Sequence, residues 1–124
     1  MWVDSWSERV IGAAIAVHHQ LGPGLLEQVY QVCLGEELRH QGIPFEAQKS
    51  VPIRYHGLVL DPGMRLDFVI GGELVVELMA VDRLTELHEA QLLSYLRMGG
   101  YPAGLLINFN ARVLENGIRR RLNE

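Results

Sequence analysis

The chain has 124 residues, of which 48% are hydrophobic and 21% charged, and its formal net charge is −4. This length suits a single domain over residues 1–124, and the composition excludes an intrinsically disordered chain. The acidic balance argues against a protein that coats nucleic acid through a basic face, and no apolar run is long enough for a transmembrane helix. Because the N-terminus also lacks a basic leader followed by an apolar block, we expect a cytoplasmic protein.

Apolar residues at spacings of three and four predict two amphipathic helices, over residues 5–21 and 25–40, separated by Gly22-Pro23-Gly24. The single cysteine, Cys33, lies among apolar residues of the second helix, where a packing role is expected rather than a nucleophilic one. Residues 51–55 alternate between apolar and polar, which predicts a strand, and a turn at His56-Gly57 leads into residues 58–60. Residues 61–63, Asp-Pro-Gly, predict another turn by composition.

Two further strands are predicted over residues 64–70 and 74–81, joined around Gly71-Gly72. The second is nearly all apolar, which is typical of a strand buried on both faces. Helical spacing returns over residues 84–98 and ends at Gly99-Gly100, and another buried strand follows over residues 103–109. A short element, a strand by its length, is expected over residues 117–122. The order of elements predicts an α/β protein with a mixed sheet flanked by helices.

Two carboxylates interrupt the apolar strands, Asp67 in the first of the two and Glu77 in the second. Burying a carboxylate costs several kcal/mol unless a partner compensates its charge. Two acids on adjacent strands could share a hard divalent cation, which takes oxygen ligands. The alternative is an ion pair, for example between Asp67 and Arg65 or Arg54.

The length of the loop between these strands decides whether the two acids meet. A two-residue Gly71-Gly72 turn would pair Ile70 with Glu73 and place the acids on opposite faces. A three-residue loop over residues 71–73 would instead pair Ile70 with Leu74, and Asp67 with Glu77. The metal hypothesis therefore predicts the three-residue loop, with a glycine at positive φ.

Other polar residues are weaker candidates for a site. Gln91 and Tyr95 lie four residues apart on one helix face, where they could reach a phosphate or a water, or form a partly exposed polar stripe. Glu27 could approach the same site or be solvated, and His18 could ligate a metal or simply pack. The C-terminal arginines form either a phosphate-binding rim or a solvated end: Arg112, Arg119, Arg120 and Arg121.

The sequence resembles a known family over nearly its whole length. The second helix opens with Gly-x2-Glu-x2-Tyr, the motif of the GxxExxY proteins, a branch of the PD-(D/E)XK nuclease superfamily. Further matches follow in order: Ile11-Gly12-Ala13-Ala14, His18, Leu21-Gly22-Pro23-Gly24, Arg65-x-Asp67, Glu77-Leu78-x-Ala80, the run from His88 to Leu96, and the run from Gly104 to Phe109.

The resemblance implies a restriction-endonuclease-like α/β core and a Mg²⁺- or Mn²⁺-dependent phosphodiesterase acting on DNA or RNA. It makes Asp67 and Glu77 the metal ligands, with the Leu78 carbonyl as a third donor and His18 as a candidate accessory ligand. Glu27 becomes the acid of the first core helix. Gln91 and Tyr95, with Arg65, become residues that bind and orient the substrate.

One position departs from the family pattern. The signature lysine, two residues after Glu77, is Met79 here, and methionine can neither position the attacking water nor offset charge on the phosphate. The chain is therefore an inactivated variant, a natural pseudo-enzyme, or an enzyme in which Arg65 substitutes for the lysine. A catalytically silent binding or regulatory module is the alternative function. The small size also suggests a homodimer.

Overall fold

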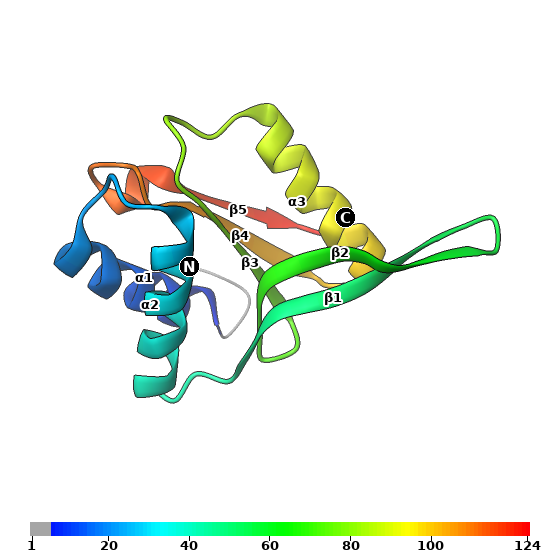
Figure 1. The fold of residues 1–124 in the computed structure, drawn as a ribbon, viewed down its shortest axis with the longest axis horizontal. Coiled ribbons are helices and arrows are strands. Elements are labelled where there is room, and N and C mark those ends of the chain that lie inside the picture. Colours follow the sequence, from blue (N-terminus) through cyan, green and yellow to red (C-terminus); the bar gives the residue numbers. More distant parts are fainter. Residues whose placement is uncertain (1–5) are drawn as a thin grey trace.

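A computed structural model describes residues 6–124 as a mixed five-stranded sheet with helices on both faces (Figure 1). The expected α/β class is confirmed. The elements in chain order are α1 (Ser7–Leu21), α2 (Glu27–His40), β1 (Phe45–Tyr55), β2 (Leu58–Ile70), β3 (Leu74–Met79), α3 (Glu86–Gly99), β4 (Ala103–Asn108), the 3₁₀ helix η1 (Leu114–Gly117) and β5 (Ile118–Leu122). The expected start of the first helix, at residue 5, lies outside the described residues.

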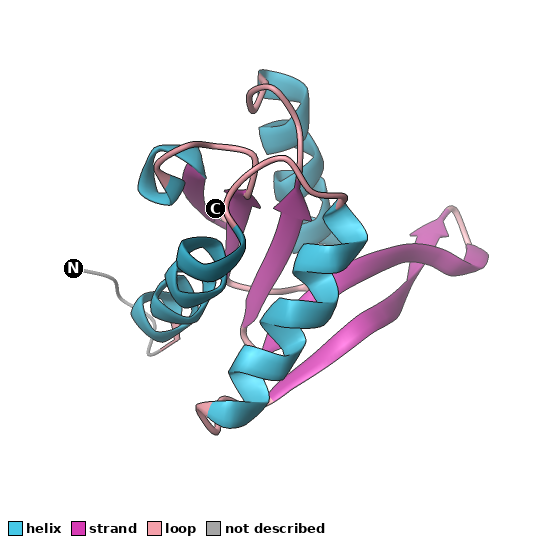
Figure 2. Cartoon of the chain, turned by 60° about the vertical axis from the view of Figure 1, so that its left-hand side comes forward, coloured by secondary structure: helices cyan, strands magenta, loops and turns pink. Residues whose placement is uncertain are grey.

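The strands lie in the order β1-β2-β3-β4-β5, and every neighbouring pair is antiparallel except β3 and β4. A parallel pair needs a crossover connection, and α3 supplies it. In Figures 1 and 2, α1 and α2 lie together on one side of the sheet and α3 lies on the other. The strands β3 and β4 are almost entirely buried, as expected for strands covered on both faces.

Two apolar clusters hold the helices to the sheet. The helices α1 and α2 contribute residues such as Val10 and Leu34 to a cluster that includes Phe68 and Phe109 of the sheet side. Cys33 packs half-buried against this cluster, in agreement with the predicted packing role. On the opposite face, apolar residues of α3 pack against Val75 and Leu106: Leu92 and Leu96.

The first two strands are longer than the sequence predicts. The strand β1 begins at Phe45, six residues earlier than expected. The sequence does not predict its first half because these residues are largely exposed and show no apolar alternation. The turn predicted at residues 61–63 is wrong, since β2 continues through them and contains a cis Asp61–Pro62 bond. The pairing register shifts between Val51 and Ile53, which accommodates the proline, and a β-carbon at Gly63 would collide with the Ile53 main chain.

The outer ends of β1 and β2 project from the body as a two-stranded arm (Figure 1). Its tip is the predicted turn at His56 and Gly57, both at positive φ. Four large apolar side chains near the tip are exposed: Tyr55, Leu58, Val59 and Leu60. Across residues 6–124, none of the helices has the length and apolarity that crossing a membrane requires.

Candidate active site

The β2–β3 connection is the three-residue loop that the metal hypothesis requires. Ile70 pairs with Leu74, and both Gly71 and Gly72 have positive φ, at 57° and 72°. The antiparallel ladder then runs only as far as Phe68 and Val76. The next pair in this register is Asp67 with Glu77, and at that point the two strands separate. The two acids therefore face each other across a gap in the sheet.

Each acid bridges the gap by accepting a main-chain hydrogen bond from the opposite strand. The Asp67 amide donates to Glu77 Oε2 over 2.7 Å, and the Leu78 amide donates to Asp67 Oδ2 over 2.8 Å. These two bonds replace the backbone pairing that the expected ladder would have made. They fix both carboxylates at the opening between β2 and β3.

The sheet is also interrupted on the other side of Asp67. The β1–β2 ladder pairs Ala47 with Phe68 and Lys49 with Leu66, and it skips the pair between Gln48 and Asp67. Gln48 has φ +53°, a left-handed conformation that is costly for a residue with a side chain. Asp67 thus lies at a point where regular pairing fails on both flanks.

Two glutamines occupy this second gap. Gln31 Nε2 of α2 donates to Asp67 Oδ1 over 2.7 Å, and Gln48 Nε2 donates to Gln31 Oε1 over 3.3 Å. Sequence reasoning missed both residues. Gln31 could have been found, because it follows Glu27 by four residues and shares its helix face. Gln48 gives no signal in the sequence, since its role depends on a left-handed backbone.

The position of Glu27 is fixed by Tyr30, one turn further along α2. The Tyr30 hydroxyl donates to the Gly22 carbonyl over 2.7 Å and accepts from the Leu25 amide over 3.1 Å. Its ring stacks on Phe109 with 4.6 Å between centroids. These contacts lock the glycine-rich turn before α2, so that Glu27 begins the helix.

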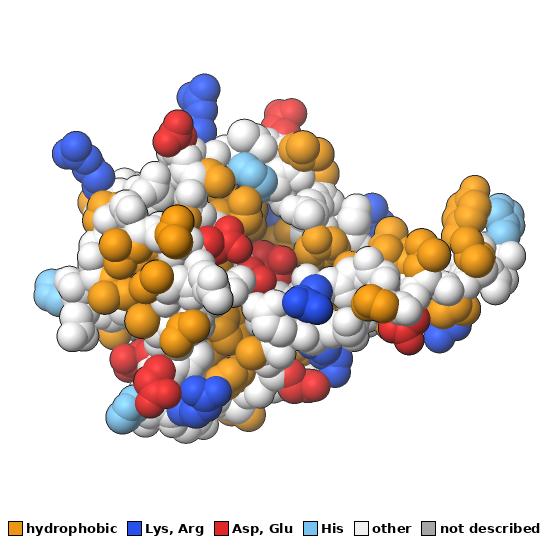
Figure 3. Space-filling view, viewed as in Figure 1, with side chains coloured by type: hydrophobic (Ala, Val, Ile, Leu, Met, Phe, Trp, Pro, Cys, Tyr) orange, Lys and Arg blue, Asp and Glu red, His pale blue; other side chains and the backbone are white. Residues whose placement is uncertain are grey.

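The electrostatics of the cluster favour a cation. Burial and the nearby Asp67 charge raise the pKa of Glu77 to about 8. Burial also raises the pKa of Asp67, and burial with the Asp67 charge raises that of Glu27. Within the described part of the chain, no Lys or Arg forms an ion pair with any of these three acids, so the alternative pairing of Asp67 with Arg65 or Arg54 is not made. Figure 3 shows acidic side chains gathered in a hollow at the centre of this face.

The helix α3 brings a phenol to the other side of Glu77. Gln91 Nε2 donates to the Tyr95 hydroxyl over 2.7 Å, as expected for residues on one helix face. Burial raises the pKa of Tyr95, and the Glu77 charge raises it further. Tyr95 therefore lies within electrostatic range of the acid pair.

Met79 and Leu78 follow Glu77 on β3. Met79 packs half-buried against the apolar cluster under α3, and its carbonyl accepts from the Phe109 amide over 2.9 Å. Successive residues of a strand present their main-chain groups to opposite sides. Since the Leu78 amide donates to Asp67, the Leu78 carbonyl also faces the gap beside the two acids.

His18 and Arg65 form no hydrogen bond or ion pair with the two acids in the described residues. His18 is buried, and its Nε2 lies 2.7 Å from the Ala111 carbonyl, while its role as an accessory metal ligand stays a prediction. Arg65 is exposed and lines a groove beside α2. The expected pairing of Arg65 with Met79 across the hairpin is wrong, because the ladder ends three residues earlier, at Phe68.

The donor set suits magnesium better than a metal that requires an all-protein cage. In residues 6–124, no group of three or more His, Cys, Asp or Glu side chains could hold a metal ion. Asp67, Glu77 and the Leu78 carbonyl nevertheless supply three hard oxygens. Mg²⁺ is usually bound by one or two carboxylates and keeps several waters, so these residues fit it.

Comparison with known proteins identifies a family for the chain. The sequence profile of the PD-(D/E)XK nuclease superfamily matches residues 4–121. Neither the curated proteins nor the solved structures contain a significant match to the chain.

Proposed function

Since the chain belongs to the PD-(D/E)XK nuclease superfamily, we propose that its acid pair is the site of a metal-dependent, nuclease-type phosphodiesterase acting on DNA or RNA. The observation that carries the proposal is the crossed pair of hydrogen bonds by which Asp67 and Glu77 hold each other at a gap in the sheet. Two partly buried acids that form no ion pair with a Lys or Arg of residues 6–124 raise the folded state's free energy, and such a cost is typical of functional sites.

The proposed metal ligands are Asp67, Glu77 and the Leu78 carbonyl, and the ion is Mg²⁺ or Mn²⁺. When bound, this ion would lower the pKa of a water and polarise a phosphoryl oxygen. Glu27 would hold a water beside Asp67, whose charge it already senses. Gln91 and Tyr95, joined by their own hydrogen bond, would orient the phosphate from the α3 side.

We also propose that the chain falls in the GxxExxY branch of the superfamily. Each residue of this motif has a structural role in the chain. Gly24 has φ +96° and its amide donates to Asn110, Tyr30 locks the turn, and Glu27 stands at the helix start between them. The three motif residues thus work together to present one acid to Asp67.

We propose further that Met79 impairs catalysis. A side chain packed among apolar residues supplies no charge to a phosphate, and loss of one such group typically costs about 10²–10⁴-fold in rate. The same observation supports the second candidate function, a catalytically silent nuclease fold that serves as a binding or regulatory module. The two candidates differ in whether the acid pair still acts on a phosphodiester.

Cleavage of labelled single- and double-stranded DNA and RNA with Mn²⁺ tests these candidates. The chain would be compared with Met79→Lys and with the double variant Met79→Lys, Asp67→Asn. Cleavage by Met79→Lys that the second substitution abolishes would support the nuclease site. If folded Met79→Lys cuts none of the four substrates, the nuclease proposal fails and the silent module takes its place.

Two expectations about the whole chain remain predictions. A single domain over residues 1–124 predicts one cooperative unfolding transition by calorimetry. The expected homodimer predicts a concentration-dependent sedimentation coefficient, and the exposed apolar arm is the surface we expect it to use.

A further inference from the structure

A groove of about 820 Å³ opens between α2 and the first two strands and adjoins the acid pair. Glu27 and Gln31 line its wall, and Gln31 is also the residue that donates to Asp67. The groove and the candidate active site therefore share a boundary. A ligand that fills the groove would end beside the carboxylates.

The lining of the groove combines cations with amides. Arg65 lies two residues before Asp67 on β2, and in the described part of the chain it forms no ion pair. Arg39 also lines the groove, where its guanidinium lies 5.4 Å from the centroid of the Phe45 ring, and it pairs with Glu36. Guanidinium groups bind phosphates and stack on bases.

The amide side chains of the groove supply the hydrogen-bond donors and acceptors that the edge of a base requires. Gln28 and Gln48 line the groove together with Gln31. An amide side chain carries both a donor and an acceptor, so it can bond the edge of an unpaired base. The Gln48 amide lies on this side of the sheet, where it donates to Gln31.

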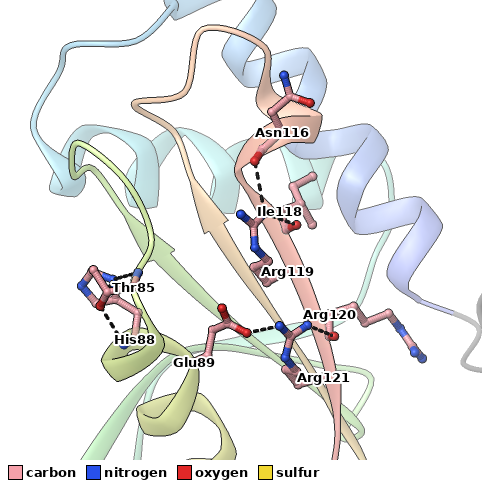
Figure 4. Close-up of polar contacts among 8 residues, drawn as sticks. All are labelled: Thr85, His88, Glu89, Asn116, Ile118, Arg119, Arg120 and Arg121. Atoms are coloured by element: carbon pink, nitrogen blue, oxygen red, sulfur yellow. Dashed lines mark hydrogen bonds and ion pairs between the residues drawn. The ribbon is translucent and has the colours of Figure 1, made fainter.

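The other arginine-rich surface, on β5, is occupied by contacts within the protein (Figure 4). Arg121 pairs with Glu89, and Arg119 donates to the carbonyls of Asn116 and Ile118. Arg120 contacts Ser7. The strand β5 also forms the sheet edge opposite to β1, three strands away from Asp67. The groove, rather than the C-terminal rim, is therefore the cationic surface next to the acid pair.

We propose that this groove binds the unpaired nucleotide next to the scissile phosphate, so that the substrate is single-stranded nucleic acid. Arg65 contacts the adjacent phosphate, and the amides of Gln28 and Gln48 contact the base. A volume of this size is that of a small-ligand site, about 300–1,000 Å³, and it accommodates one or two nucleotides rather than a duplex. The inference names the substrate of the proposed function and rests on it.

Binding can be tested apart from cleavage. Fluorescently labelled single-stranded and duplex DNA and RNA oligonucleotides would be titrated with the full chain in EDTA, where no metal is present. We expect single strands to bind more tightly than duplexes. Arg65→Gln should raise Kd for single strands about tenfold at low salt and reduce the salt slope by about 0.7, the value for one lost phosphate contact. Arg97→Gln, at an exposed arginine of α3 outside the groove, is the matched control and should change neither.

Two results would overturn the inference. One is Arg65→Gln binding single strands as tightly as the Arg97→Gln control while its melting temperature is unchanged. The other is tighter binding of duplexes than of single strands. Both results concern binding and are obtained without cleavage. The proposed function is tested separately, by whether Asp67→Asn abolishes cleavage by Met79→Lys. If cleavage depends on Asp67 but the binding of single strands does not depend on Arg65, the proposed function stands and the proposal about the groove fails.

Discussion

Glu77 and Met79 lie two residues apart on β3 and point to the same face, yet their surroundings are opposite. The Glu77 carboxylate accepts from the Asp67 amide, whereas Met79 packs against the apolar cluster under α3. In the superfamily pattern, the second position carries a lysine that would offset the charge of the acids. Among the residues that the structure describes, no lysine or arginine pairs with these acids, so their protonation and their affinity for a metal ion can be measured as consequences.

The first prediction concerns pH and the metal-free protein. Folded Glu77 keeps its proton up to a pKa of about 8, whereas the unfolded chain releases it near 4.5. Between these values the unfolded state binds fewer protons, so the free energy of unfolding should fall as pH rises from about 4.5 to about 8. Urea titrations in EDTA would measure this. Glu77→Gln should flatten the dependence, while Glu115→Gln, at an exposed acid, should leave it intact. Equal slopes for both variants would contradict the assigned cause.

The second prediction concerns divalent ions. An ion that binds only the folded state stabilises it, by about 2.7 kcal/mol at a concentration of 100 Kd. Millimolar Mg²⁺ or Mn²⁺ should therefore raise the melting temperature, and the rise should grow as pH increases through about 8, where Glu77 loses its proton. Asp67→Asn should abolish the shift. An unchanged melting temperature for the unsubstituted chain would argue heavily against a metal site.

The third prediction concerns Gln31, which holds Asp67 from the α2 side. Residues that hydrogen-bond a metal ligand typically account for about 10–100-fold in metal affinity. Gln31→Ala should weaken Mn²⁺ binding by at least the lower figure, as measured by calorimetric titration. Gln28→Ala is the control, because Gln28 lies on the same helix and is exposed. If both variants bind Mn²⁺ equally well, the hydrogen bond from Gln31 to Asp67 does not position the ligand.

The fourth prediction concerns Tyr30, whose hydroxyl joins Gly22 to Leu25. Tyr30→Phe keeps the stacking on Phe109 but removes the hydrogen-bond partner of the Gly22 carbonyl and of the Leu25 amide. We expect a loss of about 1–3 kcal/mol in the free energy of unfolding. Chemical denaturation would give this value, with Tyr101→Phe, at a partly exposed tyrosine, for comparison. A loss no larger than that of the comparison variant would mean that the turn is held by other contacts.

The acid pair can be inferred from the sequence, because a charged residue within an apolar run is recognisable in the sequence itself. Glu77 interrupts an otherwise apolar strand, and the loop of two glycines and a glutamate sets a register that brings Asp67 to it. The residues around the pair are harder to infer. Gln48 acts through a left-handed backbone, and no local pattern marks it. The first half of β1 is largely exposed, and Phe45 is the residue there that packs against the apolar core, so hydrophobic periodicity could not find this part of the strand.

The interruption of the sheet on both sides of Asp67 has a consequence for the two layers of helices. A continuous sheet separates the helices on its two faces and keeps their charges apart. Here Glu27 and Gln31 reach the acids from α2, while Tyr95 senses the same acids from α3. Two helices on opposite faces are thus coupled through one pair of carboxylates. A change in charge on either helix should alter the protonation of groups on the other.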